Sequence, residues 1–290
     1  VIMAVGCRFS EFTTKKWTLI PPGAKLIHVD IDPEELGKVY IPDVGLWGDA
    51  SYTVREMLKQ IKDGQFMNLM RAERKAWVNA LSSEYAQERI IPQEASSPSG
   101  VPSGPLVRAL QDVIDKFSPV LVMDVPTFGV WAQRYLTIKE AHKYYGCAGG
   151  SMGWGFPAAM GIQLARPEEV VVAISGDGSF WMVAQDLETA VRENIPVINV
   201  IINNFAYGNT RDRQKNTYGG RYLGVFYQNP DFEKFAQLLG VYGERVESAD
   251  QLLPAIERAI RSGKPAVINV IQDRFEGLPP GLTPLGAVIR

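Results

Sequence analysis

The sequence predicts an α/β protein whose parallel sheets carry helices on both faces. Four continuous apolar runs, at 119–125, 169–175, 196–203 and 265–271, are typical of strands covered on both sides. Segments with apolar residues at helical spacing separate these runs. This alternation favours a parallel sheet, because each crossover helix packs on one of its faces.

The first 89 residues contain a smaller set of expected elements, which we interpret as part of a separate domain. Strands are expected at 1–5 and 25–31, and helices at 30–37, 52–61 and 70–88. Residues 90–104 are rich in Pro, Ser and Gly and are expected to form a linker. Because the chain begins inside an apolar run, "VIMAVGCRF", we expect it to be a piece of a longer polypeptide.

The second expected domain spans residues 105–290. Its helices are expected at 105–117, 155–165, 181–193, after Pro230, and at 249–262. Pro105 suits the first turn of a helix, where a backbone N–H has no intrahelical partner. A long loop is expected between residue 203 and Pro230.

The composition argues against several function classes. A net charge of −2 gives no electrostatic attraction to nucleic acid or to an anionic membrane, and no apolar run reaches the roughly 18 residues of a transmembrane helix. Two histidines, His28 and His142, argue against a His/Cys zinc site and a Ser-His-Asp hydrolase. Two distant cysteines, Cys7 and Cys147, fit a reducing compartment, and we expect a cytoplasmic protein.

An aspartate stands in a glycine turn directly after the apolar run at 169–175. The stretch "SGDGSF" leads from this strand into a helix, an arrangement that usually cradles a phosphate on backbone N–H groups. Asp177 would repel that phosphate unless a divalent cation lies between them, and Mg²⁺ suits this role. The alternative is that Asp177 only caps a helix that starts near Phe180.

The next strand supplies a second polar group, because it ends at Asn203 and Asn204. The carboxyl ends of parallel strands meet at one edge of a sheet, which is where ligands bind. An asparagine side-chain oxygen is a neutral, hard ligand, and a backbone carbonyl near Ala206 completes a set for Mg²⁺. The sequence therefore predicts a metal site made by Asp177, Asn204 and Ala206.

The GDG turn, one helix, one strand and the Asn pair together resemble the thiamin diphosphate-binding motif. Longer stretches resemble the acetolactate synthase large-subunit family: "GCRF" (6–9), "HVDIDPEELGK" (28–38), "GGSMGWGFPAAMGIQLARP" (149–167), "DLETAVRENIPV" (186–197) and "NPDFEKFAQLLG" (229–240). The resemblance implies a thiamin diphosphate-binding fold for 105–290, preceded by a partial Rossmann-like central domain at 1–89.

The resemblance also implies roles for individual residues. The side chains of Asp177 and Asn204 and the carbonyl of Ala206 would bind Mg²⁺, and the N–H groups of Gly178 and Ser179 would face the diphosphate. The Gly150 carbonyl would accept a hydrogen bond from the aminopyrimidine, and Met152 would fill the space under the bent cofactor, unless it only packs in the core. The full expected cofactor-binding set is Thr127, Gly150, Ser151, Met152, Gly176, Asp177, Gly178, Ser179, Asn204, Ala206, Tyr207 and Gly208.

The sequence departs from the family pattern at two positions around the site. A Gly-Gln-His stretch that contacts the diphosphate in many members is replaced by Pro126, Thr127 and Phe128, of which Thr127 still offers one hydrogen bond. A Met and a Trp of the acetolactate synthase substrate loop become Asn209 and Arg213. Arg213 would clamp a substrate carboxylate or, alternatively, remain a solvated surface charge.

The glutamate that activates the cofactor lies, in this family, in an N-terminal pyrimidine-binding domain to which nothing in this chain corresponds. No catalytic residue is therefore expected here, and a chain or fragment with that domain is the expected partner, in a homo- or hetero-oligomer (dimer or tetramer). Arg8, Asp30 and Asp32 match a central domain that binds FAD in some members. FAD is the weaker interpretation, because acidic residues commonly end strands.

The sequence predicts a thiamin diphosphate- and Mg²⁺-dependent carboligase or lyase that acts on 2-keto acids, similar to acetolactate synthase. A 2-keto acid decarboxylase or a 2-hydroxyacyl lyase of the same superfamily is the first alternative, and Asn209 and Arg213 keep it open. An NAD-binding Rossmann protein ranks low, because "SGDGSFWM" lacks the third glycine of that fingerprint. A non-catalytic remnant is the last alternative.

Overall fold

The computed structural model describes residues 1–11, 13–61, 71–92 and 100–282. The chain divides into two compact units, Val1–Tyr85 and Ala86–Arg290. Part of the expected linker, residues 93–99, lies outside the described residues. No helix among the described residues is long and apolar enough to cross a membrane.

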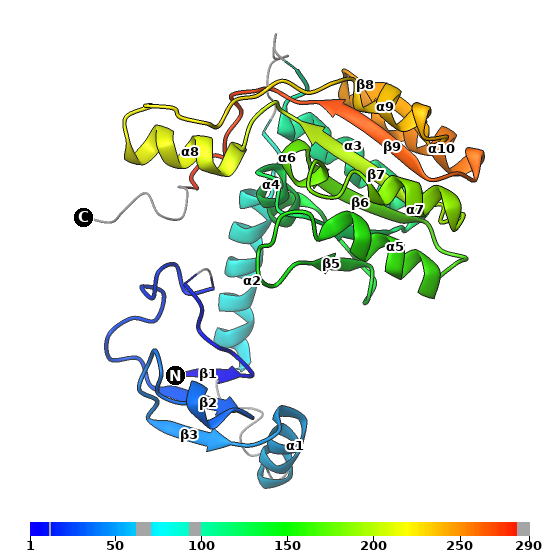
Figure 1. The fold of residues 1–290 in the computed structure, drawn as a ribbon. Coiled ribbons are helices and arrows are strands. Elements are labelled where there is room, and N and C mark those ends of the chain that lie inside the picture. Colours follow the sequence, from blue (N-terminus) through cyan, green and yellow to red (C-terminus); the bar gives the residue numbers. More distant parts are fainter. Residues whose placement is uncertain (12, 62–70, 93–99, 283–290) are drawn as a thin grey trace. The chain divides into compact units, whose positions relative to one another are not determined.

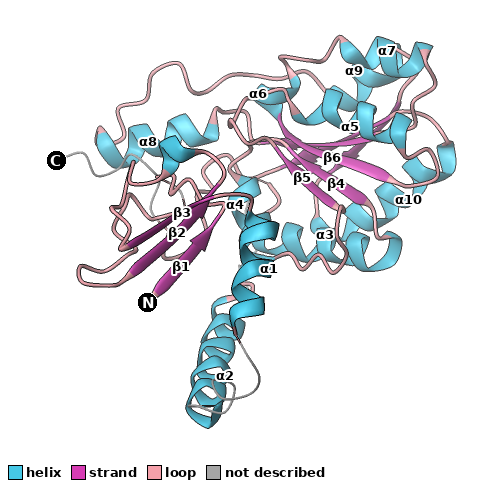
Figure 2. Cartoon of the chain, turned by 90° about the horizontal axis from the view of Figure 1, so that it is seen from below, coloured by secondary structure: helices cyan, strands magenta, loops and turns pink. Residues whose placement is uncertain are grey.

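The first unit is built on a three-stranded parallel sheet in the order β1-β2-β3 (Figure 2). Its elements are β1 (Ile2–Val5), β2 (Leu26–Asp30), the 3₁₀ helix η1 (Pro33–Glu35), β3 (Val44–Trp47), α1 (Ala50–Gln60) and all but the last three residues of α2 (Arg71–Glu88). A small core of Ala4, Phe9 and Leu26 holds the sheet. Asp32 caps η1 by accepting a hydrogen bond from the Glu34 N–H (2.9 Å).

The second unit is a six-stranded, wholly parallel sheet in the order β5-β4-β6-β7-β9-β8 (Figure 1). The strands are β4 (Val120–Met123), β5 (Tyr144–Gly146), β6 (Val171–Gly176), β7 (Ile198–Asn203), β8 (Tyr242–Val246) and β9 (Ala266–Ile271). The four predicted apolar runs form β4, β6, β7 and β9, and the predicted α/β class with parallel sheets is confirmed.

Helices cover both faces of the six-stranded sheet, and each face has its own apolar core. One core joins alternate strand residues to α3 (Ser103–Phe117), α4 (Phe128–Tyr135) and α10 (Leu252–Ser262). The other joins the remaining strand residues to α5 (Gly155–Ala165), α6 (Asp177–Phe180), α7 (Asp186–Arg192) and α9 (Phe232–Leu238). Two separate cores explain why the strands read as continuous apolar runs.

The chain order changes direction between β4 and β6. From β4 the chain goes to one side to form β5, and it then returns to the other side of β4 to form β6. Such a switch point leaves a crevice at the carboxyl ends of the two strands, where ligands bind in open parallel sheets. The topology therefore places the segments after β4, β6 and β7 around one site.

The predicted elements differ from the structure in three respects. The expected loop from 203 to 230 contains α8 (Gly208–Thr217), a helix whose residues, "GNTRDRQKNT", have no apolar stripe to reveal it. The expected helix over 181–193 is shorter in the structure: residues 181–185 form a turn, α7 covers only Asp186–Arg192, and α6 lies before this range. Four further short elements, β3, α4, β5 and β8, were not predicted.

Candidate cofactor site

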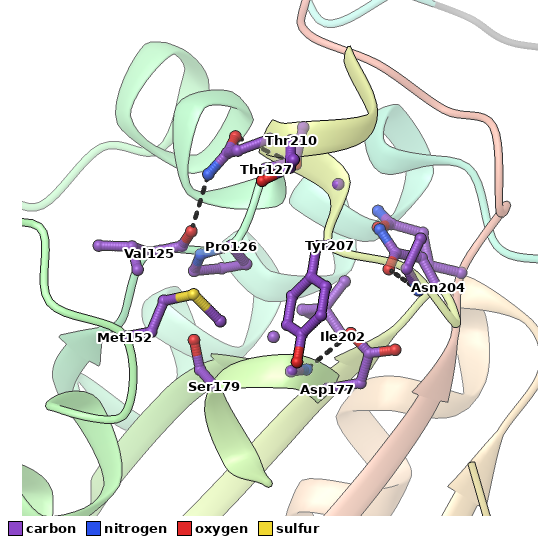
Figure 3. Close-up of a pocket in the computed structure, with 16 residues that line it drawn as sticks. Val125, Pro126, Thr127, Met152, Asp177, Ser179, Ile202, Asn204, Tyr207 and Thr210 are labelled. Carbon is purple, nitrogen blue, oxygen red and sulfur yellow. Dashed lines mark hydrogen bonds between the residues drawn. The ribbon is translucent and has the colours of Figure 1, made fainter. Parts of the chain in front are cut away.

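A cavity opens at the carboxyl edge of the six-stranded sheet, where the topology predicts it. The space within its lining, including the open solvent at its mouth, is about 440 Å³. Segments after β4, β6 and β7 form its walls (Figure 3). The lining residues are Val125, Pro126, Thr127, Met152, Gly176, Asp177, Gly178, Ser179, Ile202, Asn204, Ala206, Tyr207, Gly208, Asn209, Thr210 and Gln272.

Asp177 lies on the wall that follows β6, and its side chain is 2% exposed. Its Oδ1 accepts a hydrogen bond from the Gly178 N–H and its Oδ2 accepts one from the amide of Asn229, both at 2.9 Å. Burial raises the pKa of Asp177 to about 6, although these hydrogen bonds act in the opposite direction. A buried carboxylate of this kind favours a bound cation, which restores the charged form.

The start of α6 tests the interpretation of Asp177 as a helix cap. The helix begins at Asp177 itself and not near Phe180, and extended Gly176 occupies the N-cap position. The alternative that Asp177 is the helix cap is therefore wrong.

Gly178 lies where the chain has no room for a side chain. A Cβ at this position would stand 2.6 Å from Cε1 of Tyr207 and 2.9 Å from the Tyr227 hydroxyl oxygen. The rings of Tyr207 and Tyr227 meet edge to face, with centroids 4.9 Å apart. Glycine at position 178 therefore lets these rings approach the backbone of the turn.

The wall that follows β7 is formed by a tight backbone reversal. Asn204 is 6% exposed, and its Oδ1 accepts a hydrogen bond from the Ala206 N–H (3.1 Å), while Phe205 between them has a φ of +55°. Ala206 then pairs with Phe226 in an isolated antiparallel bridge. The Asn204 oxygen keeps a second acceptor position for a ligand.

Two hydrogen bonds connect the first turn of α8 to the segment after β4 through Asn209. Thr127 Oγ1 donates to Asn209 Oδ1 (3.3 Å), and Asn209 Nδ2 donates to the carbonyl of Val125 (3.2 Å). A Cβ on Gly208 would stand 2.5 Å from Thr127 Oγ1, so this close approach requires glycine. Asn209 thus connects two walls of the cavity.

The remaining predicted site residues are not all brought together. Met152 lines the cavity and is 37% exposed, whereas Gly150 and Ser151 of the same loop are exposed and outside the lining. Gly150 has a φ of +66°, which explains glycine there. Arg213 is exposed on α8 and does not line the cavity.

Sequence reasoning missed two groups of residues at the site. Val125, Ile202, Thr210 and Gln272 line the cavity because they flank strand ends, but nothing in their local sequence marks them. Asn229 binds Asp177 from a segment 52 residues further along the chain. Its position in "NPDFEKFAQLLG" was the available signal, since that stretch carried part of the resemblance.

Comparison with known proteins places this geometry in a family. The model "Thiamine pyrophosphate enzyme, C-terminal TPP binding domain" matches residues 124–270, which include every cavity-lining residue except Gln272, and the central-domain model of the same enzymes matches residues 1–57. The chain belongs to the thiamine pyrophosphate enzymes. Thiamine pyrophosphate is the same compound as thiamin diphosphate, so the predicted resemblance is confirmed at this level.

Several curated relatives of this thiamine pyrophosphate enzyme chain are acetolactate synthases. The probable acetolactate synthase large subunit of Methanocaldococcus jannaschii is 31% identical over 287 residues, covering 96% of this chain and 47% of that protein. Acetolactate synthase isozyme 2 large subunit of Escherichia coli K12 is 31% identical over 294 residues, covering 99% of this chain and 50% of that protein. The chain spans about half the length of the curated relatives it matches.

A solved structure shares the fold of this thiamine pyrophosphate enzyme chain. The thiamine diphosphate-dependent 4-hydroxybenzoylformate decarboxylase of Rhodococcus jostii RHA1 superposes with a TM-score of 0.70 at 25% identity. The match covers 88% of this chain and 45% of that one. The two sets of relatives therefore share the fold and carry names for different reactions.

Proposed function

We propose that this chain is the cofactor-binding part of an enzyme that uses thiamin diphosphate and Mg²⁺ to form or cleave a carbon–carbon bond in 2-keto acids, in the manner of an acetolactate synthase. One observation carries the proposal. A buried carboxylate, Asp177, and a buried amide oxygen, that of Asn204, line the same cavity at the end of adjacent strands. A carboxylate at a phosphate-binding edge would repel the phosphate unless a cation lies between these two groups.

The donor atoms at this edge fit Mg²⁺. The ion prefers oxygen ligands and keeps several positions for phosphate and water, so few protein ligands suffice. Asp177, Asn204 and the carbonyl of Ala206 would hold it.

The glycines of the site fit a diphosphate. Gly178 and Gly208 leave backbone open where a side chain would collide with its neighbours. The N–H groups of Gly178 and Ser179 would bind the phosphate oxygens, and Met152 would offer an apolar surface to the rest of the cofactor. When bound, thiamin diphosphate supplies the nucleophilic carbon for chemistry next to a carbonyl.

The family resemblance supports a site completed by other residues. The activating glutamate would come from an N-terminal pyrimidine-binding domain, in another segment or chain, and the working enzyme would be a homo- or hetero-oligomer. The residues of this chain would bind and orient the cofactor and its metal. FAD binding near Arg8, Asp30 and Asp32 remains a weaker proposal.

A second candidate is a 2-keto acid decarboxylase or 2-hydroxyacyl lyase. Asn209 favours it, because an amide fastened to Thr127 and Val125 lines the cavity where the acetolactate synthase pattern has a methionine. The Rhodococcus jostii decarboxylase, which has the same fold, agrees with this reading.

Cofactor binding is tested by calorimetric titration of Mg²⁺ and thiamin diphosphate into the full-length protein. We expect binding that needs both components, and its loss in Asp177→Ala. Asp250→Ala, which removes an exposed carboxylate of the same unit, is the matched control and leaves binding unchanged. Metal-independent binding, or binding that survives in Asp177→Ala, contradicts the proposal.

The reaction is tested by product analysis with pyruvate. Acetolactate supports the carboligase, and acetaldehyde alone supports the decarboxylase. If pyruvate is not turned over while the cofactor binds, the substrate is another 2-keto acid or the reaction is that of a 2-hydroxyacyl lyase, which a screen of these two substrate classes separates.

A further inference from the structure

Asn229 makes contacts that neither the motif nor the family comparison assigns. It lies three residues before the start of α9 and is half-buried. Its Nδ2 donates to Asp177 Oδ2 and to Asn203 Oδ1, both at 2.9 Å, and its Oδ1 accepts from the Trp181 indole N–H (2.8 Å). Both amide hydrogens and the carbonyl are therefore in use, and the side chain has one orientation.

Two hydrogen bonds orient the Asp177 carboxylate. Asn229 holds one oxygen and the Gly178 N–H holds the other. A carboxylate offers about four acceptor positions, of which these two bonds take one on each oxygen, and the Tyr227 hydroxyl and the Phe205 backbone also act on Asp177 and lower its pKa. A lysine or arginine in place of Asn229 would neutralise the carboxylate and compete with a cation, whereas a neutral amide orients the carboxylate and leaves its charge.

A buried chain of amides keeps Asn229 itself in place. Asn203 Nδ2 donates to Asn269 Oδ1 (3.1 Å), and Asn269 Nδ2 donates to Glu233 Oε2 (2.7 Å). Asn203, Asn269 and Glu233 are 1%, 0% and 6% exposed and belong to β7, β9 and α9. Because each amide is oriented by the next, the network links the Asp177 turn to the body of the sheet.

We propose that Asn229 is the positioning residue of the metal-binding carboxylate, holding Asp177 in the orientation that Mg²⁺ requires. The inference rests on the proposed function, since it concerns the same site. Mg²⁺ tolerates little deviation from octahedral geometry, so a carboxylate free to rotate binds it less well. Loss of a partner that orients a metal ligand typically weakens metal affinity by about 10- to 100-fold.

The test is Mn²⁺ binding, measured by electron paramagnetic resonance on the full-length protein at saturating thiamin diphosphate, with Mn²⁺ as the probe for the Mg²⁺ site. We expect Asn229→Ala to raise the Mn²⁺ Kd by about 10- to 100-fold. Asn229→Ser keeps one donor and is expected to give a smaller increase. Asn216→Ala is the matched control: the Asn216 amide donates to the Asp212 carbonyl (2.8 Å) outside the cavity lining, and its loss leaves the Kd unchanged.

The thermal unfolding midpoint of each metal-free variant distinguishes a positioning role of Asn229 from a purely structural role. That role would lower the midpoint of Asn229→Ala and leave the Mn²⁺ Kd of the folded protein at its original value, which would overturn the inference. If Asn229→Ala does not fold, a Kd for Asn229→Ser equal to that of the unmodified protein overturns it instead. Absence of Mn²⁺ binding by the unmodified protein overturns the proposed function and this inference together, whereas normal binding in Asn229→Ala overturns this inference alone.

Discussion

The segments that follow β6 and β7 form facing walls of one cavity, but different forces hold them. After β6 the chain enters α6 at once, and Phe180 at its end is fully buried, with its ring 5.1 Å from that of Phe232 in an edge-to-face contact. Phe180 belongs to an apolar core that also contains residues of β4, β6, β7 and β9. The Asp177 turn is therefore part of the cooperative core.

The segment after β7 is held by polar contacts. Arg211 of α8 is 1% exposed, pairs with Asp212 (2.7 Å) and donates to the carbonyls of Arg274 and Glu276. These bonds fasten a polar helix to the segment that follows β9. Since few apolar contacts are involved, α8 is expected to open locally at a lower free energy than the core.

The wall after β6 and the wall after β7 are therefore expected to respond to different changes. The Asp177 turn is expected to be lost only when the domain unfolds, because Phe180 belongs to the core, whereas the wall with Asn209 depends on a few polar side chains. The site thus combines a carboxylate held by the apolar core with a wall, after β7, that is held by polar contacts. Substitutions in each of the two segments test this difference.

The largest effect is expected for Phe180→Ala, which leaves a cavity between α6 and α9. We expect a loss of about 3–5 kcal/mol in the free energy of global unfolding, measured by urea denaturation. Leu238→Ala, at an exposed position on α9, is the control and has little effect. An unchanged urea midpoint in Phe180→Ala would show that the Asp177 turn is not part of the cooperative core.

Arg211→Met is expected to act locally. It leaves Asp212 buried without its ion-pair partner, at a cost of about 3 kcal/mol. Hydrogen exchange is expected to show faster exchange of the α8 amides while the amides of β6 and β7 keep their protection. Arg213→Met, two residues away and exposed, is the control. Equal loss of protection across the sheet would contradict the division between the walls.

Asp177→Asn is expected to remove a pH dependence from the stability of the metal-free protein. Burial raises the folded-state pKa to about 6 from 3.8, so between these values the folded state binds more protons than the unfolded state, and stability falls as pH rises. Above pH 6, the buried charge of Asp177 lowers the free energy of unfolding by on the order of 3 kcal/mol, and this loss disappears below about pH 4. Thermal unfolding across pH checks this; Asp250→Asn, at an exposed position, is the control, and a pH-independent difference contradicts it.

The smallest effect is expected for Thr127→Val, which removes the hydrogen bond to Asn209 and keeps the side-chain shape. We expect about 0.5–1 kcal/mol less protection of the first α8 amides in hydrogen exchange. Thr217→Val, at the exposed end of α8, is the control. If Thr127→Val leaves exchange unchanged, this hydrogen bond does not fasten the two walls.

Local patterns were enough to predict the sheet and the strand ends. The apolar runs became β4, β6, β7 and β9, and the GDG turn and the Asn pair stand where those runs end. Helix α8 could not be predicted in this way, because hydrophobic periodicity is the main local signal and this helix has none. The same limit explains why the helix expected over 181–193 begins only at Asp186, because its apolar residues continue through the turn at 181–185.

The sequence by itself determined the fold class, the identity of the chemical groups at the sheet edge, and the resemblance that relates them to thiamin diphosphate. These depend on residue type and short spacing, which a linear chain carries. Tertiary structure alone decided that Asn229 reaches Asp177, that Asn209 fastens α8 to the segment after β4, and that Arg213 lies outside the cavity. Such contacts join residues many positions apart, and their energies are realised only once the sheet has brought its strand ends together.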